Sequence, residues 1–546
     1  MASIGSDRST RSNALWGRGG RRAGAAIVSS VCAFAAATAA AAAPGISAPL
    51  KGAFVQPSLA SAALAKPDGS FDVIVEGDRK GGTAGFVKKA LAGVTVKRQF
   101  RSIDGVRATL TGKQVQQLAH VNGVTAILPN EPVKLSSVAL PASNSQKWAW
   151  VTHTPVDWTQ QSLNLSTPTI AVVDSGIDAS RADFGGRVLG QANLYSGTGA
   201  NSAGDGYGHG TFVASIAAGA ADGMAGVAPQ ANLLSLDVIG DNDDASVSDI
   251  VAACDWILAN KATYNIRVVN MSLQGGNRAS VFFDPLDQAV ERLWLNGVVV
   301  VTAAGNYGVD GAAREVSYAP GNDPFVITVG ASDVMDTLST SDDVAAPWSA
   351  WGYTADGFAK PDLAAPGRYV VGAVPNGAGL TVERPDHVVG DGLMQLSGTS
   401  FSAPEVSGAA ALILARHPDW TPDQVKGALM VSAQYTPAAA PHSLGFGELD
   451  VASARAVTSP PNPNAGLDQF VGADANGAPV FDAAAWSDAA WSDAAWSDAA
   501  WSDAAWSDSA DEASLGLPAT RVTDDEMSSV EQLLGIVDPA TDPTAG

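Results

Sequence analysis

Three side chains that lie far apart in this 546-residue sequence have the types and surroundings that acyl-transfer chemistry needs. Ser400 lies among small residues and precedes the apolar run from Ala409 to Ala415, which predicts a helix that begins close to Ser400. Backbone N–H groups at a helix N-terminus favour a nearby negative charge, such as the oxyanion of acyl transfer. A serine at this position can also be only a helix cap. The rest of the sequence must decide between these two roles.

A serine hydroxyl becomes an effective nucleophile when a general base takes its proton and a third group orients that base. His209 lies between two glycines at the start of a second run of small residues, where other groups can approach the imidazole closely. Asp174 ends the apolar, β-branched run that begins at Thr169. This run predicts a buried parallel strand with Asp174 at its carboxyl end, the edge where catalytic groups collect in doubly wound sheets.

Together these settings resemble the signatures of the subtilisin-like serine proteases, the subtilases. The three signatures are Asp174-Ser-Gly, His209-Gly-Thr and Gly398-Thr-Ser-Phe-Ser-Ala-Pro. They occur in the chain order Asp, His, Ser, which is the order in subtilisin. The resemblance covers about residues 148–457. It implies a serine endopeptidase with an α/β, subtilisin-like three-layer fold and a mostly parallel sheet.

A fourth element agrees with this resemblance. Asn306 follows another apolar run and matches the asparagine of the family's oxyanion hole. The resemblance implies that Ser400 attacks the peptide carbonyl while His209 accepts and returns the proton. Asp174 would orient the imidazole, and Asn306 would donate a hydrogen bond to the oxyanion. A rival hypothesis is an inactive relative that binds peptides, but a binding module has no need of all four residues.

The resemblance also implies where a substrate binds. It implies a strand edge that pairs with an extended peptide and a wall of the pocket for the residue before the scissile bond. The edge comprises Ser272, Leu273, Gln274 and Gly275, and the wall comprises Ala303, Ala304 and Gly305. Gln274 departs from the family pattern, which has glycine there. We expect protein or peptide substrates in extended conformation, and no particular sequence preference follows from these residues.

Metal ions are not required for the chemistry that the resemblance implies. Structural calcium is common in the family, and a run that includes Asp241, Asp243 and Asp244 contains potential oxygen ligands. The spacing of these aspartates matches no calcium-binding loop, and an acidic run after a strand is usually a solvated loop. The sequence therefore assigns no metal ligands.

The segments between the signatures alternate between strand and helix patterns. Short apolar runs predict strands, and longer amphipathic runs predict helices. The predicted strands are Leu233–Ile239, Val268–Leu273, Val298–Thr302 and Phe325–Gly330, and the predicted helices are Ser246–Asn260 and Pro285–Asn296. Apolar strands separated by helices predict a parallel sheet that is covered on both faces.

The charge of the chain is distributed unevenly. The net charge of −23 comprises +4 in residues 1–50, +6 in residues 51–135, −18 in residues 136–455 and −15 in residues 456–546. An acidic surface repels phosphate, so nucleic acid is excluded as a partner. The pattern indicates a cationic N-terminal region that faces an acidic body. At 46% hydrophobic residues the chain can form a sizeable core.

Residues 1–43 have the composition of a secretory signal peptide. Five arginines precede an alanine-rich apolar run, and Ala41–Ala43 supply small residues for cleavage. The alternative, a transmembrane anchor, fits less well because the run has few leucines and isoleucines. We therefore expect a secreted protein. Removal of the signal leaves Cys254 as the one cysteine, so no intrachain disulfide forms, and its amphipathic setting predicts a buried thiol.

Residues 44–140 are predicted to form a propeptide. Between about residues 70 and 133 the pattern is β-α-β-β-α-β, which predicts a small ferredoxin-like domain. A free-standing binding module is the alternative. Its position before residues 141–457, the predicted catalytic domain, resembles that of the family's inhibitory, I9-like propeptide. This resemblance implies an intramolecular inhibitor and folding aid, with self-cleavage between Pro129 and about Ala142.

Residues 458–546 form a linker and an acidic tail with a five-residue repeat. Each repeat contains Trp-Ser-Asp, and the tryptophans are Trp486, Trp491, Trp496, Trp501 and Trp506. Five residues advance a helix by about 140°, so the indoles form no single stripe. Disorder is one interpretation. The other is an adhesive segment whose indoles bind a cell-surface polymer or another protein, which would make the enzyme cell-surface associated or the protease domain subsidiary to an adhesin.

Overall fold

The computed structural model describes the chain from residue 53 to residue 486, with short gaps. The gaps are residues 79–81, 92–93, 136–146, 155–166, 222–223, 279, 310–312, 314, 475–476 and 484. All described residues belong to one unit, Lys51–Gly546. The predicted signal peptide, the half of the predicted self-cleavage segment that follows Leu135 and the repeats beyond Trp486 lie outside the described residues.

The N-terminal domain, residues 53–135, contains the predicted order of strands and helices. Its elements are β2 (Ser70–Gly77), α2 (Thr83–Ala90), β3 (Val96–Gln99), β4 (Gly105–Thr111), α3 (Gly112–Leu118) and β5 (Val124–Pro129). Two elements are additional to the prediction: β1 (Phe54–Val55), which pairs with β5, and α1 (Pro57–Ala65). The sheet order is β1-β5-β2-β4-β3. A last strand, β6 (Val133–Leu135), pairs outside this sheet.

A mostly parallel sheet forms the centre of the main domain, residues 147–486. Its order is β16-β15-β14-β12-β7-β11-β8, and β19 also pairs with β15. The strands are β7 (Thr169–Asp174), β8 (Val188–Asn193), β11 (Leu233–Asp237), β12 (Ile266–Met271), β14 (Val299–Ala303), β15 (Ile327–Asp333), β16 (Val344–Ala345) and β19 (Leu363–Pro366). Among the described strand pairs of this sheet, only β15–β16 is antiparallel. The predicted fold class is therefore confirmed.

The central strands form because their apolar, β-branched residues are covered on both faces. Every residue of β7, β11, β14 and β15 is buried. Such strands are typical of parallel sheets that lie between two layers of helices. The parallel register aligns Asp174, the last residue of β7, with the last residue of β11, Asp237. The catalytic candidate thus lies at the carboxyl edge of the sheet.

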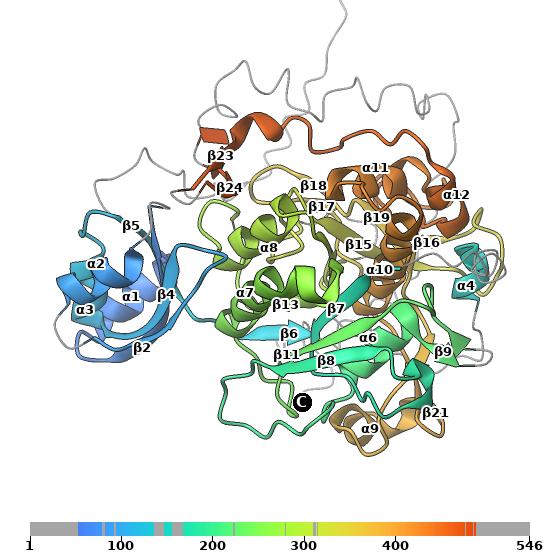
Figure 1. Ribbon diagram of the computed structural model, residues 1–546, viewed down its shortest axis with the longest axis horizontal. Helices are drawn as coiled ribbons and strands as arrows, with labels where there is room; N and C mark the ends of the chain where they lie inside the picture. Colours follow the sequence, from blue (N-terminus) through green and yellow to red (C-terminus); the bar gives the residue numbers. More distant parts are fainter. Residues whose placement is uncertain are drawn as a thin grey trace, which may run out of the picture. The chain divides into compact units, whose positions relative to one another are not determined.

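Helices form the outer layers, as Figure 1 shows. Within the described residues, the helices of the main domain are α4 (Trp148–Val151), α6 (His209–Ala218), α7 (Val247–Tyr264), α8 (Pro285–Leu295), α9 (Gly379–Glu383), α10 (Thr399–Arg416), α11 (Pro422–Val431) and α12 (Val451–Ala456). α7 packs against α8, whereas α10 packs against α6, β12, β14 and β15. The helices predicted at Ser246–Asn260 and Pro285–Asn296 correspond to α7 and α8.

Smaller elements complete the main domain. They are the pair β9 (Ala220–Ala221) and β10 (Met224–Ala225), β13 (Leu273–Gly275), the pair β17 (Gly352–Tyr353) and β18 (Ala359–Lys360), the sheet of β20 (Val370–Ala373), β21 (Val388–Gly390) and β22 (Leu393–Leu396), the hairpin β23 (Val471–Ala473) and β24 (Pro479–Phe481), and the 3-10 turns at Ala182–Phe184, Pro385–His387 and Asp468–Phe470. The hairpin packs on the main domain through Phe481, whose buried ring lies 5.0 Å from the Phe325 ring. Ordered packing therefore continues beyond residue 457, where the predicted tail begins.

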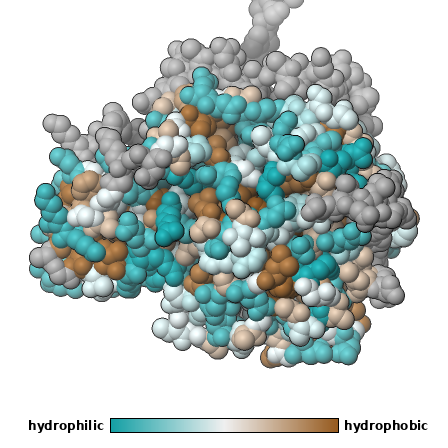
Figure 2. All heavy atoms as spheres, viewed as in Figure 1, coloured by the Kyte–Doolittle hydropathy of each residue, from teal (hydrophilic) through white to brown (hydrophobic). Residues whose placement is uncertain are grey.

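The surface is mainly hydrophilic, with separate apolar patches, as Figure 2 shows for one face. Large apolar side chains that are exposed come from different elements and loops, including Leu64, Leu189, Leu338, Val382 and Val431. Scattered exposed apolar residues are ordinary for a folded protein. Among the described helices, none combines the length and the apolarity that crossing a lipid bilayer would require.

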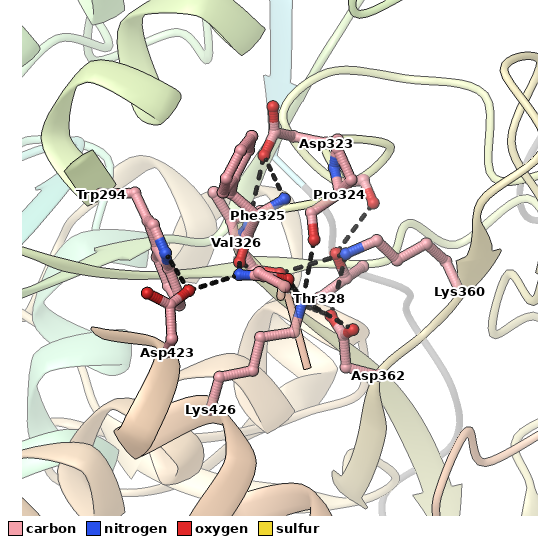
Figure 3. Close-up of polar contacts among 12 residues, drawn as sticks. Trp294, Asp323, Pro324, Phe325, Val326, Thr328, Lys360, Asp362, Asp423 and Lys426 are labelled. Carbon is pink, nitrogen blue, oxygen red and sulfur yellow. Dashed lines mark hydrogen bonds and ion pairs between the residues drawn. The ribbon is translucent and has the colours of Figure 1, made fainter. Parts of the chain in front are cut away.

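A buried ion cluster fixes the segment that leads into β15 (Figure 3). Lys360 and Lys426 both contact the carboxylate of Asp362, at 2.9 and 3.0 Å, and all three side chains are fully buried. Lys426 Nζ also donates to the carbonyl oxygens of Pro324, Phe325 and Val326, at 2.8, 3.3 and 3.2 Å. Burial alone would raise the pKa of Asp362, but the two ammonium groups outweigh it and hold that pKa below its usual range. The cluster connects α11 to the central sheet.

Candidate active site

The structure brings the predicted acid and base together. Asp174 is the last residue of β7, and His209 is the first residue of α6. The imidazole Nδ1 lies 2.9 Å from Asp174 Oδ1 and 3.0 Å from Oδ2, and both side chains are fully buried. An ionised carboxylate only accepts hydrogen bonds, so Nδ1 carries the proton and Nε2 is left as an acceptor.

Two glycines near Asp174 and His209 are required because other backbone segments come too close to leave room for a side chain. Gly176 has a φ of 106°, and a Cβ atom there would lie 1.9 Å from the carbonyl oxygen of Gly204. A Cβ atom on Gly210 would lie 2.1 Å from the carbonyl oxygen of Gly176. No real Cβ atom fits at these distances. The glycines of the Asp-Ser-Gly and His-Gly-Thr signatures therefore allow β7 and α6 to meet closely enough for the hydrogen bond.

A second buried aspartate, Asp205, holds the two signatures in place, and the sequence analysis did not identify it. Its carboxylate accepts hydrogen bonds from Ser175 Oγ at 2.9 Å, Gly208 N at 2.7 Å, Thr211 N at 2.7 Å and Thr211 Oγ1 at 2.5 Å. Burial raises the pKa of Asp205 to about 6, although these hydrogen bonds oppose the shift. Its position four residues before His209, at a predicted helix N-terminus, was the available signal.

Ser400 is the second residue of α10, as the sequence predicted for a residue close to a helix N-terminus. Its hydroxyl donates to the carbonyl oxygen of Ser272 at 3.0 Å. Within the described residues, His209 Nε2 is buried and has no hydrogen-bond partner. The Phe401 ring lies 5.5 Å from the imidazole ring. The expected hydrogen bond from Ser400 to His209 is thus not formed in this state, and such bonds often tighten only when substrate binds.

Pro404 explains how Ser400 is fixed in α10. A helical carbonyl normally accepts from the N–H four residues later, but proline has no N–H. The Ser400 carbonyl accepts instead from Ser272 Oγ, at 2.8 Å. Ser272 Oγ in turn accepts from Asn270 Nδ2 at 2.9 Å. Because of the proline in the serine signature, the Ser400 carbonyl is available to Ser272, and this hydrogen bond connects α10 to the end of β12.

Asn306 presents its amide N–H group with a fixed orientation. Its Oδ1 accepts hydrogen bonds from Thr399 N at 3.0 Å and from Thr399 Oγ1 at 2.9 Å. Its Nδ2 is buried and, among the described residues, has no partner. A donor with its geometry already set and no competing acceptor is the arrangement that stabilises a developing oxyanion. The predicted role of Asn306 is consistent with this geometry.

The predicted substrate edge is occupied by a strand of the N-terminal domain. β13 pairs antiparallel with β6, so that Leu273, Gln274 and Gly275 lie opposite Leu135, Lys134 and Val133. On the other side of this strand, Val133 N donates to Ala245 O at 3.2 Å, and Val247 N donates to Glu131 O at 2.9 Å. A segment in extended conformation therefore lies between two edges and uses main-chain hydrogen bonds.

The predicted pocket wall follows β14 directly. Ala303 ends the strand, and Ala304 and Gly305 are its next residues, with Gly305 at a φ of 103°. A Cβ atom on Gly305 would lie 2.2 Å from Cε1 of Tyr307 and 2.6 Å from Oε1 of Gln274. Gln274, the departure from the family pattern, thus lies beside this wall. The sequence did not predict the neighbouring Tyr307.

Negative charge around His209 favours its protonated form. Burial alone would lower the pKa of His209, but the Asp174 carboxylate outweighs it and holds the pKa above the ordinary value of 6.5. Asp243 and Asp205 contribute to the same shift. Burial raises the pKa of Asp243 itself to about 7. Asp243 is therefore a further acidic residue near the site.

The acidic run after β11 forms loop contacts. Asp241 accepts hydrogen bonds from the backbone N and the hydroxyl of Ser202 at 2.9 and 2.6 Å, and Asp244 accepts from the Tyr195 hydroxyl. Among the described residues, no group of three or more His, Cys, Asp or Glu side chains is arranged to hold a metal ion. These aspartates do not fit a calcium site, and no metal ligands are assigned.

Comparisons with known proteins agree with this geometry. The family model described as the subtilase family matches residues 166–447. Serine protease AprX of Bacillus subtilis is 33% identical over 343 residues, which cover 61% of this chain and 74% of that protein. Subtilisin NAT of Bacillus subtilis subsp. natto is 32% identical over 350 residues, which cover 63% and 79%.

A solved structure is similar in fold. It is fervidolysin from Fervidobacterium pennivorans, described as a keratinolytic enzyme related to subtilisin. The TM-score is 0.52 at 22% sequence identity, and the match covers 72% of this chain and 62% of that one. At this level of identity the likeness supports the fold alone.

Proposed function

The chain belongs to the subtilase family and is a serine endopeptidase, and we propose that Ser400 is its nucleophile, His209 its general base and Asp174 the group that orients the base. The observation that carries this proposal is a pair of buried atoms without partners among the described residues, His209 Nε2 and Asn306 Nδ2. They are the atoms that must accept the serine proton and donate to the oxyanion. Leaving such atoms unpaired costs stability, so their retention supports a functional role.

The reaction begins when the Ser400 hydroxyl turns from the Ser272 carbonyl toward His209 Nε2. Its oxygen attacks the peptide carbonyl, a C–O bond forms, and the proton passes to Nε2. Asp174 stabilises the resulting imidazolium, which then protonates the leaving amine as the C–N bond breaks. Water repeats these steps on the acyl-enzyme and releases the acid. All the groups required are side chains and backbone of this chain, so the chemistry needs no cofactor.

Substrates are proteins or peptides, and we infer that they bind in extended conformation between β13 and residues 245–247. The position of β6 supports this binding mode, because it makes main-chain hydrogen bonds to both edges. Main-chain pairing does not depend on side-chain identity, so many sequences can bind. Ala303, Ala304 and Gly305 would line the pocket for the residue before the scissile bond, with Gln274 beside them.

The N-terminal domain acts in this proposal as an inhibitory propeptide and folding aid. Asn130 Oδ1 accepts from Ser248 N at 2.9 Å, which caps the N-terminus of α7. Asp255 of the same helix accepts from Arg101 N at 2.9 Å. The domain thus supports a helix of the main domain while β6 blocks the cleft. Cleavage by the enzyme itself, shortly after Leu135, would free the domain to dissociate, and its departure would end the block.

The proposal includes export from the cell. Residues 1–43 would act as a signal peptide, and the mature enzyme would work outside the cell. The basic, alanine-rich sequence of this segment supports this part of the proposal.

The proposal is tested with residues 44–546 expressed as wild type, as Ser400→Ala and as Ser402→Ala. Ser402 is the matched control because it belongs to the same signature and is equally buried. We expect wild type and Ser402→Ala to lose roughly residues 44–140 by mass and to digest casein, whereas Ser400→Ala stays intact and inactive. A folded wild-type chain that neither shortens nor digests casein would reject the proposal in favour of an inactive, peptide-binding relative.

A further inference from the structure

Aromatic rings from four parts of the chain form a continuous row beside the N-terminus of α8. The Phe54 ring stacks on Phe283 at 4.1 Å with an interplanar angle of 10°. Phe283 lies 6.0 Å from Phe282, and Phe282 lies 5.9 Å from Trp486. Trp486 also stacks on Phe358 at 4.7 Å. We call these five residues the aromatic row.

Two members of the aromatic row, Phe54 and Trp486, belong to segments outside the predicted catalytic domain, residues 141–457. Phe54 lies in β1 of the N-terminal domain. Trp486 is the first tryptophan of the tail repeat, and a single helical turn positions it. The backbone N–H of Trp486 donates to the Asp482 carbonyl at 3.0 Å, and Ala485 N donates to Asp482 Oδ1 at 3.0 Å. Phe481, which is fully buried, anchors this turn to the main domain.

The following repeats resemble this turn but have one alanine fewer between the aspartate and the tryptophan. Each later tryptophan is preceded by Asp-Ala-Ala, and for Trp491 the aspartate is Asp488. The tail therefore supplies further indoles of the kind that already occupies the row.

Removal of the N-terminal domain would uncover one face of Phe283. The loop that carries this ring remains anchored, because Asp356 accepts from Ser280 Oγ at 2.7 Å and from Val281 N at 3.0 Å. We propose that Trp491 replaces Phe54 on Phe283 when the N-terminal domain leaves, so that the first two tail repeats cover the aromatic row of the mature enzyme. The occupant is a segment of this same chain.

The distances allow this exchange. The successive ring separations of 5.9, 6.0 and 4.1 Å limit how far Phe54 can lie from Trp486. Five residues of extended chain reach about 17 Å, which is enough for Trp491 to arrive at the Phe54 position. Of the later tryptophans, Trp491 has the shortest tether, so its docking orders the fewest residues of the tail. An indole offers at least the ring area of the phenyl group that it replaces.

The test measures which tryptophans are protected from added chymotrypsin, which cuts after aromatic residues. The first chain is inactive Ser400→Ala, residues 44–546, in which Phe54 covers Phe283. The second chain adds Phe54→Ala, which uncovers Phe283 without any self-cleavage. We expect cleavage after Trp491 and Trp501 at equal rates in the first chain. In the second we expect cleavage after Trp491 to be about fivefold slower than after Trp501.

Controls separate this inference from the proposed function. The Phe54→Ala chain needs no protease activity, so failure of self-cleavage would not affect its result. The matured wild type, treated with a serine-reactive inhibitor and freed of excess reagent, should show the same protection, and a further Phe283→Ala substitution should abolish it. Equal cleavage after Trp491 and Trp501 in both uncovered forms would overturn the proposal. So would protection that grows with protein concentration, because the indole would then come from a second copy.

Discussion

Replacement of Asn306 by alanine is the sharpest test of the proposed oxyanion hole. Asn306 Nδ2 is buried without a partner among the described residues, and two hydrogen bonds to Thr399 fix the amide. Because the donor is already oriented, its full effect should appear in the transition state. We expect kcat to fall by about 10² to 10³, or about 3 kcal/mol, with KM nearly unchanged.

The assay is hydrolysis of a chromogenic peptide by mature enzyme, with kcat and KM determined separately. Thr399→Val is the matched variant, since it keeps the Asn306 donor and removes one of the two hydrogen bonds that orient it. We expect a smaller loss in kcat, about fivefold, without a change in KM. Both variants must be assayed well below their unfolding temperatures, because Asn306→Ala also leaves polar atoms of Thr399 unpaired.

Two results would contradict this reasoning. A loss in kcat of less than tenfold for Asn306→Ala would mean that another donor carries the oxyanion. A rise in KM with unchanged kcat would mean that Asn306 stabilises the ground state and the transition state equally.

Three further predictions concern charge and burial. His209 must be neutral to accept a proton, so activity is lost as the pH falls through the pKa of His209. Because that pKa is raised, the acid limb of the kcat/KM profile should lie above pH 6.5. The Asp243→Asn substitution removes a nearby negative charge and should move this acid limb to lower pH. In the inactive serine variant, Lys426→Met should lower the free energy of unfolding, measured in urea, by about 3 to 5 kcal/mol. The control Lys89→Met, at an exposed position, should lower it by less than about 0.5 kcal/mol. Equal effects of the two substitutions would mean that the buried ion cluster does not stabilise the fold. The buried Cys254 thiol should react with a thiol reagent only after unfolding, and reaction in the native state would contradict its burial.

The parts of the site that the sequence predicted depend on local patterns. Asp174 ends a strand, His209 begins a helix and Ser400 lies in the first turn of another, as their flanking residues indicated. Apolar strands alternating with helices predicted the parallel sheet for the same reason. The buried state predicted for Cys254 is also confirmed. Short-range periodicity and glycine positions are sufficient for such predictions.

The features that the sequence did not predict depend on contacts between distant segments. Ser272 Oγ and the Ser400 carbonyl are 128 residues apart, and only the folded sheet brings them within 2.8 Å. Asp205 has a visible position before His209, but its four hydrogen-bond donors could not be deduced from spacing. Trp486 lies in a repeat that has no amphipathic period, so its packing against Phe358 was not foreseeable from a helical or strand pattern.

The placement of β6 implies that cleavage of the chain and departure of the N-terminal domain are separate events. Its contacts with the cleft lie at Glu131 and Val133 and along the β6–β13 pair, all before the bond that we propose is cut. Breaking a bond after Leu135 therefore removes none of these contacts, and the severed domain remains a competitor for the cleft. Digestion of foreign protein should begin only after a lag that follows chain cleavage. Since free enzyme can destroy the severed domains of its neighbours, the first molecules to escape would shorten that lag for the rest.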